Sequence, residues 1–337
     1  MNPSMMQRRD FIRAAAMAAF APGCVSIGAR RDTRLKKLGT IDILIVETSP
    51  IVFKGHPWLM EYIRWKTPQK HYRTNNTGVS YLRFRDLEDK QTFTPPFGRD
   101  FHLASAFSTG DRVIVTASAH GERDSWGGSA ILQTESQDLV NWTAPRRILG
   151  DPRWQVYNTS ICRADGRYLM VYELGAPRDL VGTGFTMFFA ESKDLATWKT
   201  IDGAVFGREF YTGGPLLRYH AGWTYLFYLE QRAVGGALEF RTRVARSRDL
   251  VSWTVSPRVA LDYDADDKLI HPQAKFTPAE LDEIRNAKDI NVSDLDFCEF
   301  GGKLICSYSW GDQKGHEFLA LGEVDSTERE FCESFFE

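Results

Sequence analysis

The sequence predicts an all-β fold, a five-bladed β-propeller of four-stranded antiparallel blades. A short phrase, Ser-x-Asp-Leu-x-x-Trp, occurs three times along the chain. Its aspartates, Asp138, Asp194 and Asp249, lie 56 and then 55 positions apart. A constant period of this length marks one supersecondary unit rather than a whole domain. Apolar strand patterns accompany every copy, so the repeat predicts a ring of similar β-modules.

Two weaker copies extend the repeat. Asp86-Leu87 lies 52 residues before Asp138, and Phe93 stands where the later copies carry Trp. A fifth run, 294–321, follows a longer insertion and keeps the strand rhythm without the phrase. Five units of about 55 residues then fill the chain from about residue 40 to its end, as a propeller requires.

Each unit is predicted to be an antiparallel meander, because short apolar runs alternate with tight turns. The second run of each unit is apolar on both faces, which is expected where blades stack. These second strands are predicted at 58–62, 112–116, 168–173, 225–230 and 304–309.

The repeated phrase is interpreted as scaffold. An Asp side chain can accept backbone N–H bonds and hold a tight turn, while Leu and Trp supply apolar area for burial between blades. No chemistry is assigned to these residues.

Composition narrows the function classes. With 337 residues, of which 43% are hydrophobic and 13% aromatic, the chain can bury a large core. The formal net charge of −2 gives no basic surface, which argues against nucleic acid and anionic membranes as partners. No run of eighteen apolar residues occurs, so no transmembrane segment is expected in the mature chain.

Residues 1–26 are predicted to be an export signal. Arg8-Arg9 precedes a short apolar run, 14–21, and the paired arginines resemble a twin-arginine signal. A periplasmic or extracellular location follows. The segment 21–24 resembles a lipobox with Ala instead of the usual Leu, so Cys24 is either lipidated as an anchor or incidental. Residues 27–39 are predicted to be a linker, and 40–337 the propeller.

The cysteines beyond Cys24 do not suggest a disulfide framework. A two-residue hairpin at Gly301-Gly302 would place Cys298 opposite Ile305 and Cys306 opposite Phe297. Side chains alternate along a strand, so the two sulfurs point to different faces. We expect buried free thiols.

An insertion, 262–286, precedes the last unit. Its helix is predicted to open with Thr277 as N-cap. The Asp cluster at 262–268 could hold structural Ca²⁺, but it lacks the spacing and terminal Glu of an EF-hand loop, so a solvated acidic loop is the alternative. No obligate cofactor and no metal ligand are predicted.

The candidate site follows from propeller geometry. Inner strands begin near the mouth of the central channel, and second strands end there, so both sets of positions converge on one pocket. Inner-strand starts supply Glu47, His102, Asn158, Asp294 and Asp296, and second-strand ends supply Glu61, Glu173, Glu230 and Trp310.

Several of these residues suit glycosidic bond cleavage, which needs two carboxyl groups. Glu173 and Glu230 close apolar runs, where burial favours the protonated form that a general acid needs. A more solvated Asp294 or Glu47 would stay ionised as base or nucleophile. The alternative is a structural role in which these acids bind strand ends and arginines.

The remaining candidates are predicted to bind substrate. Trp310 could stack on a sugar ring, and His316 could bind hydroxyls. The full substrate-binding set is Glu61, His102, Asn158, Asp296, Trp310 and His316.

The phrase, the unit count and the segments 157–160 and 165–173 resemble the five-bladed β-propeller glycoside hydrolases, the superfamily that includes families 43, 32, 62, 117 and 130. In the family 43 pattern, inner strands begin with an Asp base, a second Asp that tunes pKa, and a Glu acid in a Glu-Gly-Pro motif. Here the first position holds Glu47, and the second falls at Tyr157-Asn158. The third reads Gly213-Gly214-Pro215, without an acid.

The resemblance therefore implies a glycoside hydrolase whose acid comes from elsewhere, with Glu173 or Glu230 as candidates. A related family uses His as acid, which keeps His102 under consideration. The sequence predicts an exported hydrolase of a glycan or oligosaccharide. The alternatives are a carbohydrate-binding propeller without catalysis, and a lyase or transferase that uses the same pocket.

Overall fold

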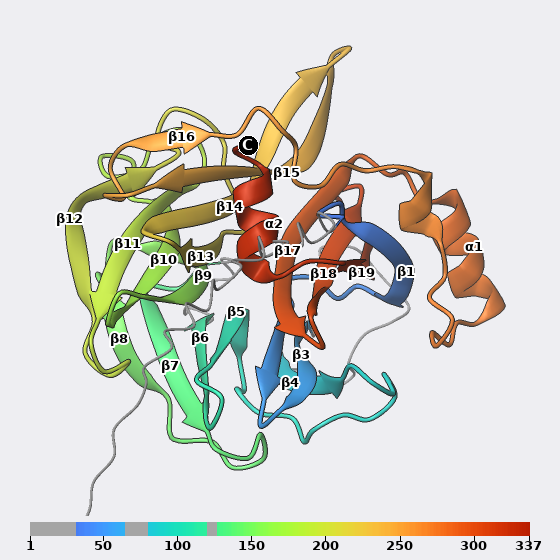
Figure 1. Ribbon diagram of the computed structural model, residues 1–337, viewed down its shortest axis with the longest axis horizontal. Coiled ribbons are helices and arrows are strands. Elements are labelled where there is room, and N and C mark those ends of the chain that lie inside the picture. The colour runs from blue at the N-terminus through green and yellow to red at the C-terminus, as the bar shows by residue number, and fades with distance from the viewer. Residues whose placement is uncertain (1–31, 65–79, 120–126) are drawn as a thin grey trace, which may run out of the picture. The chain divides into compact units, whose positions relative to one another are not determined.

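A computed structural model describes residues 32–64, 80–119 and 127–337 (Figure 1). The predicted export signal, Cys24 and the start of the predicted linker lie outside these ranges. Within them, no helix is long and apolar enough to cross a membrane.

The strands form successive antiparallel meanders (Figure 1). The first contains β2 (Ser49–Phe53), β3 (His56–Ile63) and β4 (Tyr81–Asp86). The second contains β5 (Phe101–Ser108), β6 (Val113–Ala119), β7 (Ala130–Ser136) and β8 (Arg146–Gly150). The third contains β9 (Gln155–Ala164), β10 (Arg167–Ala176), β11 (Thr186–Ser192) and β12 (Lys199–Phe206). The fourth contains β13 (Leu216–His220), β14 (Trp223–Val234), β15 (Ala237–Ser247) and β16 (Trp253–Val255).

The last meander joins the two ends of the described chain. It contains β17 (Asn291–Phe300), β18 (Lys303–Gly311) and β19 (Glu317–Val324), and β1 (Lys36–Ile43) pairs antiparallel with β19 as its outer strand. The segment 36–39, predicted to be linker, is therefore part of a strand. Its pairing partner, β19, lies almost 300 residues away in sequence, so local pattern could not reveal it.

The inner strands close a circle. Contacts run from β2 to β5, β5 to β9, β9 to β13, β13 to β17, and β17 back to β2. The predicted all-β fold is confirmed. The number of blades stays a prediction, because a parallel bridge between Phe240 and Asn291 joins the last two meanders into one hydrogen-bonded sheet.

The scaffold role of the repeated phrase is confirmed. Asp138 Oδ1 accepts the backbone N–H groups of Val140 and Asn141 at 2.9 and 2.7 Å, and Asp194 and Asp249 do the same in their copies. The leucine that follows each Asp is buried and adopts left-handed backbone, with φ between 61° and 63°. The repeated phrase therefore forms a tight turn that is held by its Asp and buries its Leu.

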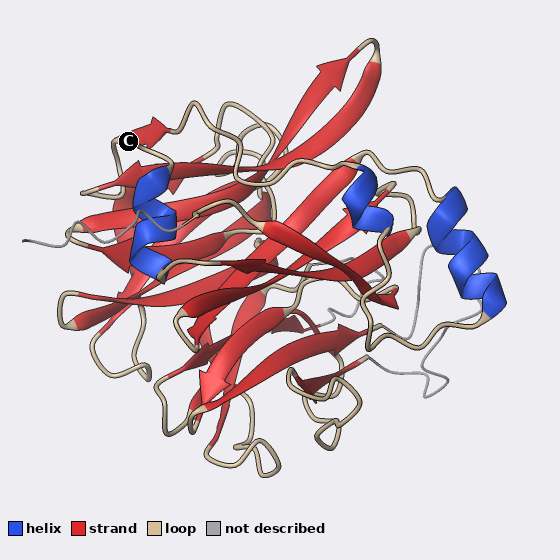
Figure 2. Cartoon of the chain, turned by 45° about the vertical axis from the view of Figure 1, so that its right-hand side comes forward, coloured by secondary structure: helices blue, strands red, loops and turns tan. Residues whose placement is uncertain are grey.

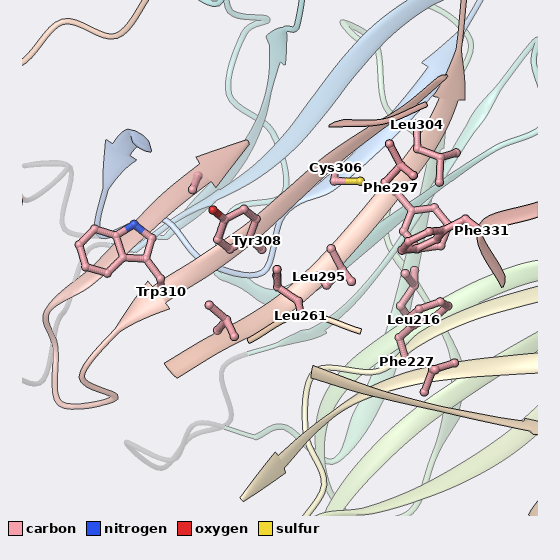
Figure 3. Close-up of a cluster of buried hydrophobic side chains, with 14 of the residues drawn as sticks. Leu216, Phe227, Leu261, Leu295, Phe297, Leu304, Cys306, Tyr308, Trp310 and Phe331 are labelled. Carbon is pink, nitrogen blue, oxygen red and sulfur yellow. The ribbon is translucent and has the colours of Figure 1, made fainter. Parts of the chain in front are cut away.

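The largest buried cluster lies between the fourth and fifth meanders and includes Phe227, Phe297, Phe331 and Cys306 (Figure 3). Phe331 comes from α2 (Glu328–Ser334), which packs on β13. The cysteine prediction is confirmed: Cys298 pairs with Ile305 and Cys306 with Phe297 in the register, and both thiols are free and buried.

The insertion before the last meander forms η1 (Ala265–Lys268) and α1 (Pro278–Asn286) at the periphery (Figure 2). Thr277 caps α1 as predicted, in a reciprocal pair with Glu280. Asp267 in the acidic segment is buried and accepts from Lys37 Nζ at 2.7 Å. This ion pair fixes the insertion to β1.

Candidate functional site

A cavity of about 550 Å³ opens at one end of the channel. Inner-strand entries supply Glu47, Asn158 and Asp294, and the second strand β10 supplies Glu173. The prediction that strand starts and strand ends converge at the channel mouth thus holds for these four residues. Arg64 and Glu317 complete the charged part of the lining.

Unusual backbone geometry marks the entries to the inner strands. Glu47, Leu103, Gly214 and Asp294 all adopt left-handed backbone, with φ between 51° and 55°, and all line the cavity. For Glu and Asp this conformation costs free energy, and such strain concentrates at functional sites. The register between β17 and β18 also shifts between Ser293 and Asp296. A bulge of this kind re-aims a side chain, here that of Asp294.

Glu173 is 1% exposed and accepts a hydrogen bond from Asn158 Nδ2 at 3.1 Å. Burial raises the pKa of its carboxyl to about 8, because desolvation disfavours the charged form. Glu173 is therefore mostly protonated at neutral pH.

The pKa of Asp294 is raised less than that of Glu173. Burial raises the pKa of its carboxyl to about 6, while a 2.7 Å hydrogen bond from Ser293 Oγ favours the ionised form. Asp294 is therefore mostly ionised at neutral pH. Two acids in one cavity thus differ in protonation state, which is the division of roles that acid and base catalysis uses.

Glu47 lies near both acids. Burial and then the negative charge of Asp294 raise its pKa well above the ordinary value, whereas Arg64 opposes this shift. Its Oε2 has no hydrogen-bond partner among the described residues. Asp294 and Glu47 are both half-buried, whereas Glu173 is 1% exposed, so the second acid is more accessible to solvent than Glu173, as expected.

Sequence analysis missed Glu317 as a site residue. It begins β19 and binds the guanidinium of Arg64, which also donates to the carbonyl of Leu44 at 3.4 Å. The sequence instead predicts that Trp310 and His316, in the segment before β19, bind substrate. An acid at the start of a third strand carries no pattern that separates it from the many exposed acids of the chain.

The aromatic lining was also missed. Tyr157, Phe185 and Tyr211 line the cavity, with ring centroids 4.5 Å apart for Tyr157 and Phe185 and 5.6 Å apart for Phe185 and Tyr211. All three are only partly buried. Phe185 and Tyr211 lie in loops between strands, where hydrophobic periodicity gives no signal.

Glu61 is placed in the wall of the first meander instead of the cavity. Its carboxylate is fully buried and accepts from both Arg83 and Arg85. Arg85 also donates to Asp42 on β1 at 2.5 Å. Glu61 therefore belongs to a structural ion-pair network, which is the alternative that the sequence left open for single acids.

Glu230 lies outside the cavity, one residue after Leu229, which is the residue that matches Glu173 in the next meander. It accepts from Arg241 Nε at 2.8 Å and lies 3.5 Å from Arg243 Nη1. Its neighbour Leu229 lines the cavity, and adjacent side chains on a strand point to opposite faces. Alternation therefore turns Glu230 away.

Trp310 has no accessible face. Its indole is 0% exposed, stacks on Phe318 at 4.3 Å and donates from Nε1 to Thr40 Oγ1 at 2.9 Å. Figure 3 shows it at one end of the buried cluster. The predicted stacking on a sugar is thus corrected: pairing with β1, which sequence analysis did not foresee, covers this position.

The other three predicted residues do not line the cavity. His102 is fully buried, and its neighbour Leu103 reaches the lining instead. His316 is exposed and lies 3.5 Å from Glu283 of α1. Asp296 binds Arg218 at 2.7 Å and lines a second cavity of about 400 Å³ beside that arginine. It also lines a small pocket that it shares with Glu47, Asn158 and Asp294.

Among the described residues, no group of three or more His, Cys, Asp or Glu side chains has an arrangement that could hold a metal ion.

Comparisons with known proteins find similarity at the level of structure. No family model matches the sequence, and no curated protein matches it. An N-acetylgalactosamine deacetylase from F. plautii superposes with a TM-score of 0.56 at 11% identity, covering 89% of this chain and 97% of that one. A putative glycoside hydrolase from Parabacteroides distasonis gives 0.53 at 11% identity, covering 91% and 96%.

An α-L-arabinanase from Penicillium chrysogenum gives a TM-score of 0.53 at 11% identity, covering 85% of this chain and 98% of that one. At such identities the likeness concerns the fold and not the reaction. The predicted propeller fold is confirmed by this comparison, since the chain shares its fold with these solved structures.

Proposed function

We propose that this protein hydrolyses glycosidic bonds, with Glu173 as general acid and Asp294 as its ionised partner. The observation that carries the proposal is the meeting of Glu47, Glu173 and Asp294 in one aromatic-lined cavity, with different protonation states at neutral pH. Because related folds include a deacetylase, the fold alone does not select the reaction.

Glu173 would donate its proton to the leaving glycosidic oxygen as the bond to the anomeric carbon breaks. Asp294 would either accept a proton from the attacking water or bond to the anomeric carbon before water displaces it. The carbon gains an oxygen from water in both cases. The anomer released first, observed by proton NMR, distinguishes inversion from retention.

Glu47 would act as a neutral neighbour. Two carboxylates that interact closely do not both ionise readily, so an ionised Asp294 favours protonated Glu47. A protonated Glu47 can donate a hydrogen bond to a substrate hydroxyl.

Gly213 supports the choice of Glu173 as acid. A Cβ at Gly213 would lie 3.7 Å from Glu173 Oε1. This glycine stands where the family 43 pattern carries its Glu acid. The carboxyl of Glu173 thus occupies, from the neighbouring strand, space next to the position of the absent acid.

A bell-shaped pH dependence is expected. Asp294 must be ionised, so kcat/KM should rise as pH increases through about 6, and Glu173 must be protonated, so kcat/KM should fall through about 8. Purified protein would first be screened on aryl glycosides and oligosaccharides, and the pH profile measured on the best substrate. A profile without an alkaline fall would contradict the role of Glu173.

Saturable glycan binding without turnover would instead favour the alternative, a binding propeller.

We further propose export by the twin-arginine route, which rests on Arg8-Arg9 and the apolar run after them. Cell fractionation of an Arg8→Lys, Arg9→Lys variant tests this proposal. If the variant is still exported, the twin-arginine route is excluded.

A further inference from the structure

Strands β14 and β15 continue past the cavity as a two-stranded hairpin, residues 231–240, called the arm below. It turns at Gly235-Gly236 and projects from the body of the molecule (Figures 1 and 2). Leu229 on β14 lines the cavity, and the arm follows directly in the same strand. The arm therefore stands beside the cavity mouth.

The two faces of the arm differ in chemistry. Residues directly opposite each other in an antiparallel pair share a face. One face carries the ion pair between Arg232 and Glu239, at 3.0 Å, next to that of Glu230 and Arg241. The other face carries uncharged residues in two opposed pairs. These are Gln231 with Phe240 and Ala233 with Leu238.

The uncharged face is accessible and apolar. Leu238 is 51% exposed, and Ala233 is exposed as well. In a hairpin surrounded by water, an apolar side chain at this position gains no burial. A ligand that covered Leu238 would supply that burial.

A row of aromatic rings connects the cavity with the arm. Tyr157, Phe185 and Tyr211 line the cavity, and the centroid of Tyr211 lies 5.9 Å from that of Phe240 at the base of the uncharged face. Each ring in the row contacts the next. The row ends at Phe240, which is buried and lies two residues from the exposed Leu238 on the same face of the arm.

We propose that the uncharged face of the arm binds the distal residues of an oligosaccharide whose scissile bond lies in the cavity. Sugar rings present apolar C–H faces that pack on aromatic and aliphatic side chains, and hydroxyls that an amide such as Gln231 can bind. The charged face of the arm points away from this path, so the arm offers only uncharged groups to the oligosaccharide. This inference rests on the proposed glycosidase activity. It specifies that the substrate is an oligosaccharide of several sugar residues.

The test compares Leu238→Asn with Val234→Asn on substrates of increasing length. Val234 is 43% exposed on the ion-paired face of the same arm and is a matched control. In the wild type, kcat/KM should rise at least tenfold from an aryl monoglycoside to the hexasaccharide glycoside of the same phenol. Leu238→Asn should remove about tenfold of kcat/KM on the hexasaccharide and leave the monoglycoside unchanged, because it removes about one buried side chain's worth of contact. Val234→Asn should alter neither.

Equal effects of the two variants, or no dependence on chain length in the wild type, would overturn the inference. So would a shift from dimer to monomer in Leu238→Asn without length dependence, because a second copy would then cover the arm. If no substrate is turned over, calorimetric titration with the same oligosaccharides separates the two claims. Length-dependent binding that Leu238→Asn weakens would sink only the proposed hydrolysis, whereas turnover without length dependence would sink only the role of the arm.

Discussion

Glu173→Gln is expected to lower kcat/KM on unactivated oligosaccharides by 10²- to 10⁴-fold, the range that a general acid contributes. The amide cannot donate a proton to the leaving oxygen, although it keeps the size of the side chain and can still bind Asn158. Aryl glycosides with an acidic phenol need little protonation, so their cleavage should fall far less. The alkaline fall of the pH profile should also disappear, since Glu173 sets it.

Glu230→Gln is the matched control. Glu230 ends the same kind of apolar strand run, one residue past the position that matches Glu173, and binds Arg241 outside the cavity. It should keep near wild-type turnover on every substrate. Equal losses with activated and unactivated leaving groups in Glu173→Gln would contradict acid catalysis by Glu173, and a loss in Glu230→Gln of the same size would contradict the choice between the two acids.

Asp294→Asn is expected to lower kcat/KM by 10²-fold or more on all substrates, activated ones included, because the ionised partner is needed whatever the leaving group. The acidic limb near pH 6 should vanish with it. Asp296→Asn serves as control: Asp296 lies two residues along the same strand but binds Arg218, so it should retain the acidic limb.

Asp294→Asn should also change the stability of the protein in a pH-dependent way. The pKa of Asp294 is raised on folding, so its contribution to stability is fully present below pH 3.8 and is lost as pH rises through about 6. Asn carries no charge and avoids this loss, which amounts to roughly 3 kcal/mol at pH 8. Urea unfolding at pH 4 and pH 8 should show that the free energy of unfolding of Asp294→Asn rises relative to the wild type only at pH 8. An equal difference at both pH values would show that Asp294 is not buried as described.

The sequence revealed the blade architecture because the repeated Asp and Leu form local turns, and local contacts leave a local pattern. The cysteine faces and the cap at Thr277 followed for the same reason. Among candidate acids, Glu173 and Asp294 were found because strand starts and ends meet at the channel mouth.

The errors have physical causes of two kinds. Trp310 and the linker residues 36–39 were misjudged because β1 pairs with β19 at the other end of the chain. Glu230 was misjudged because one residue of strand alternation decides whether a side chain enters the cavity. Asp296 lies beside the cavity, where it binds Arg218, a partner far away in the sequence. Tyr211 and Phe185 come from loops, whose course depends on packing that sequence periodicity does not report.

The most direct test of the central claim is the kcat/KM of the double variant Glu173→Gln, Gly213→Glu on an unactivated oligosaccharide. Gly213 has no positive φ, and a Cβ there would meet only ordinary contacts, the nearer at 3.5 Å from the Tyr211 hydroxyl oxygen. A carboxyl from position 213 can therefore enter the space beside residue 173. If Glu173 is the acid that replaces the one absent at 213, the double variant should recover at least tenfold over Glu173→Gln alone. A wild type that turns over no glycoside, or a folded double variant no more active than the single one, would contradict it.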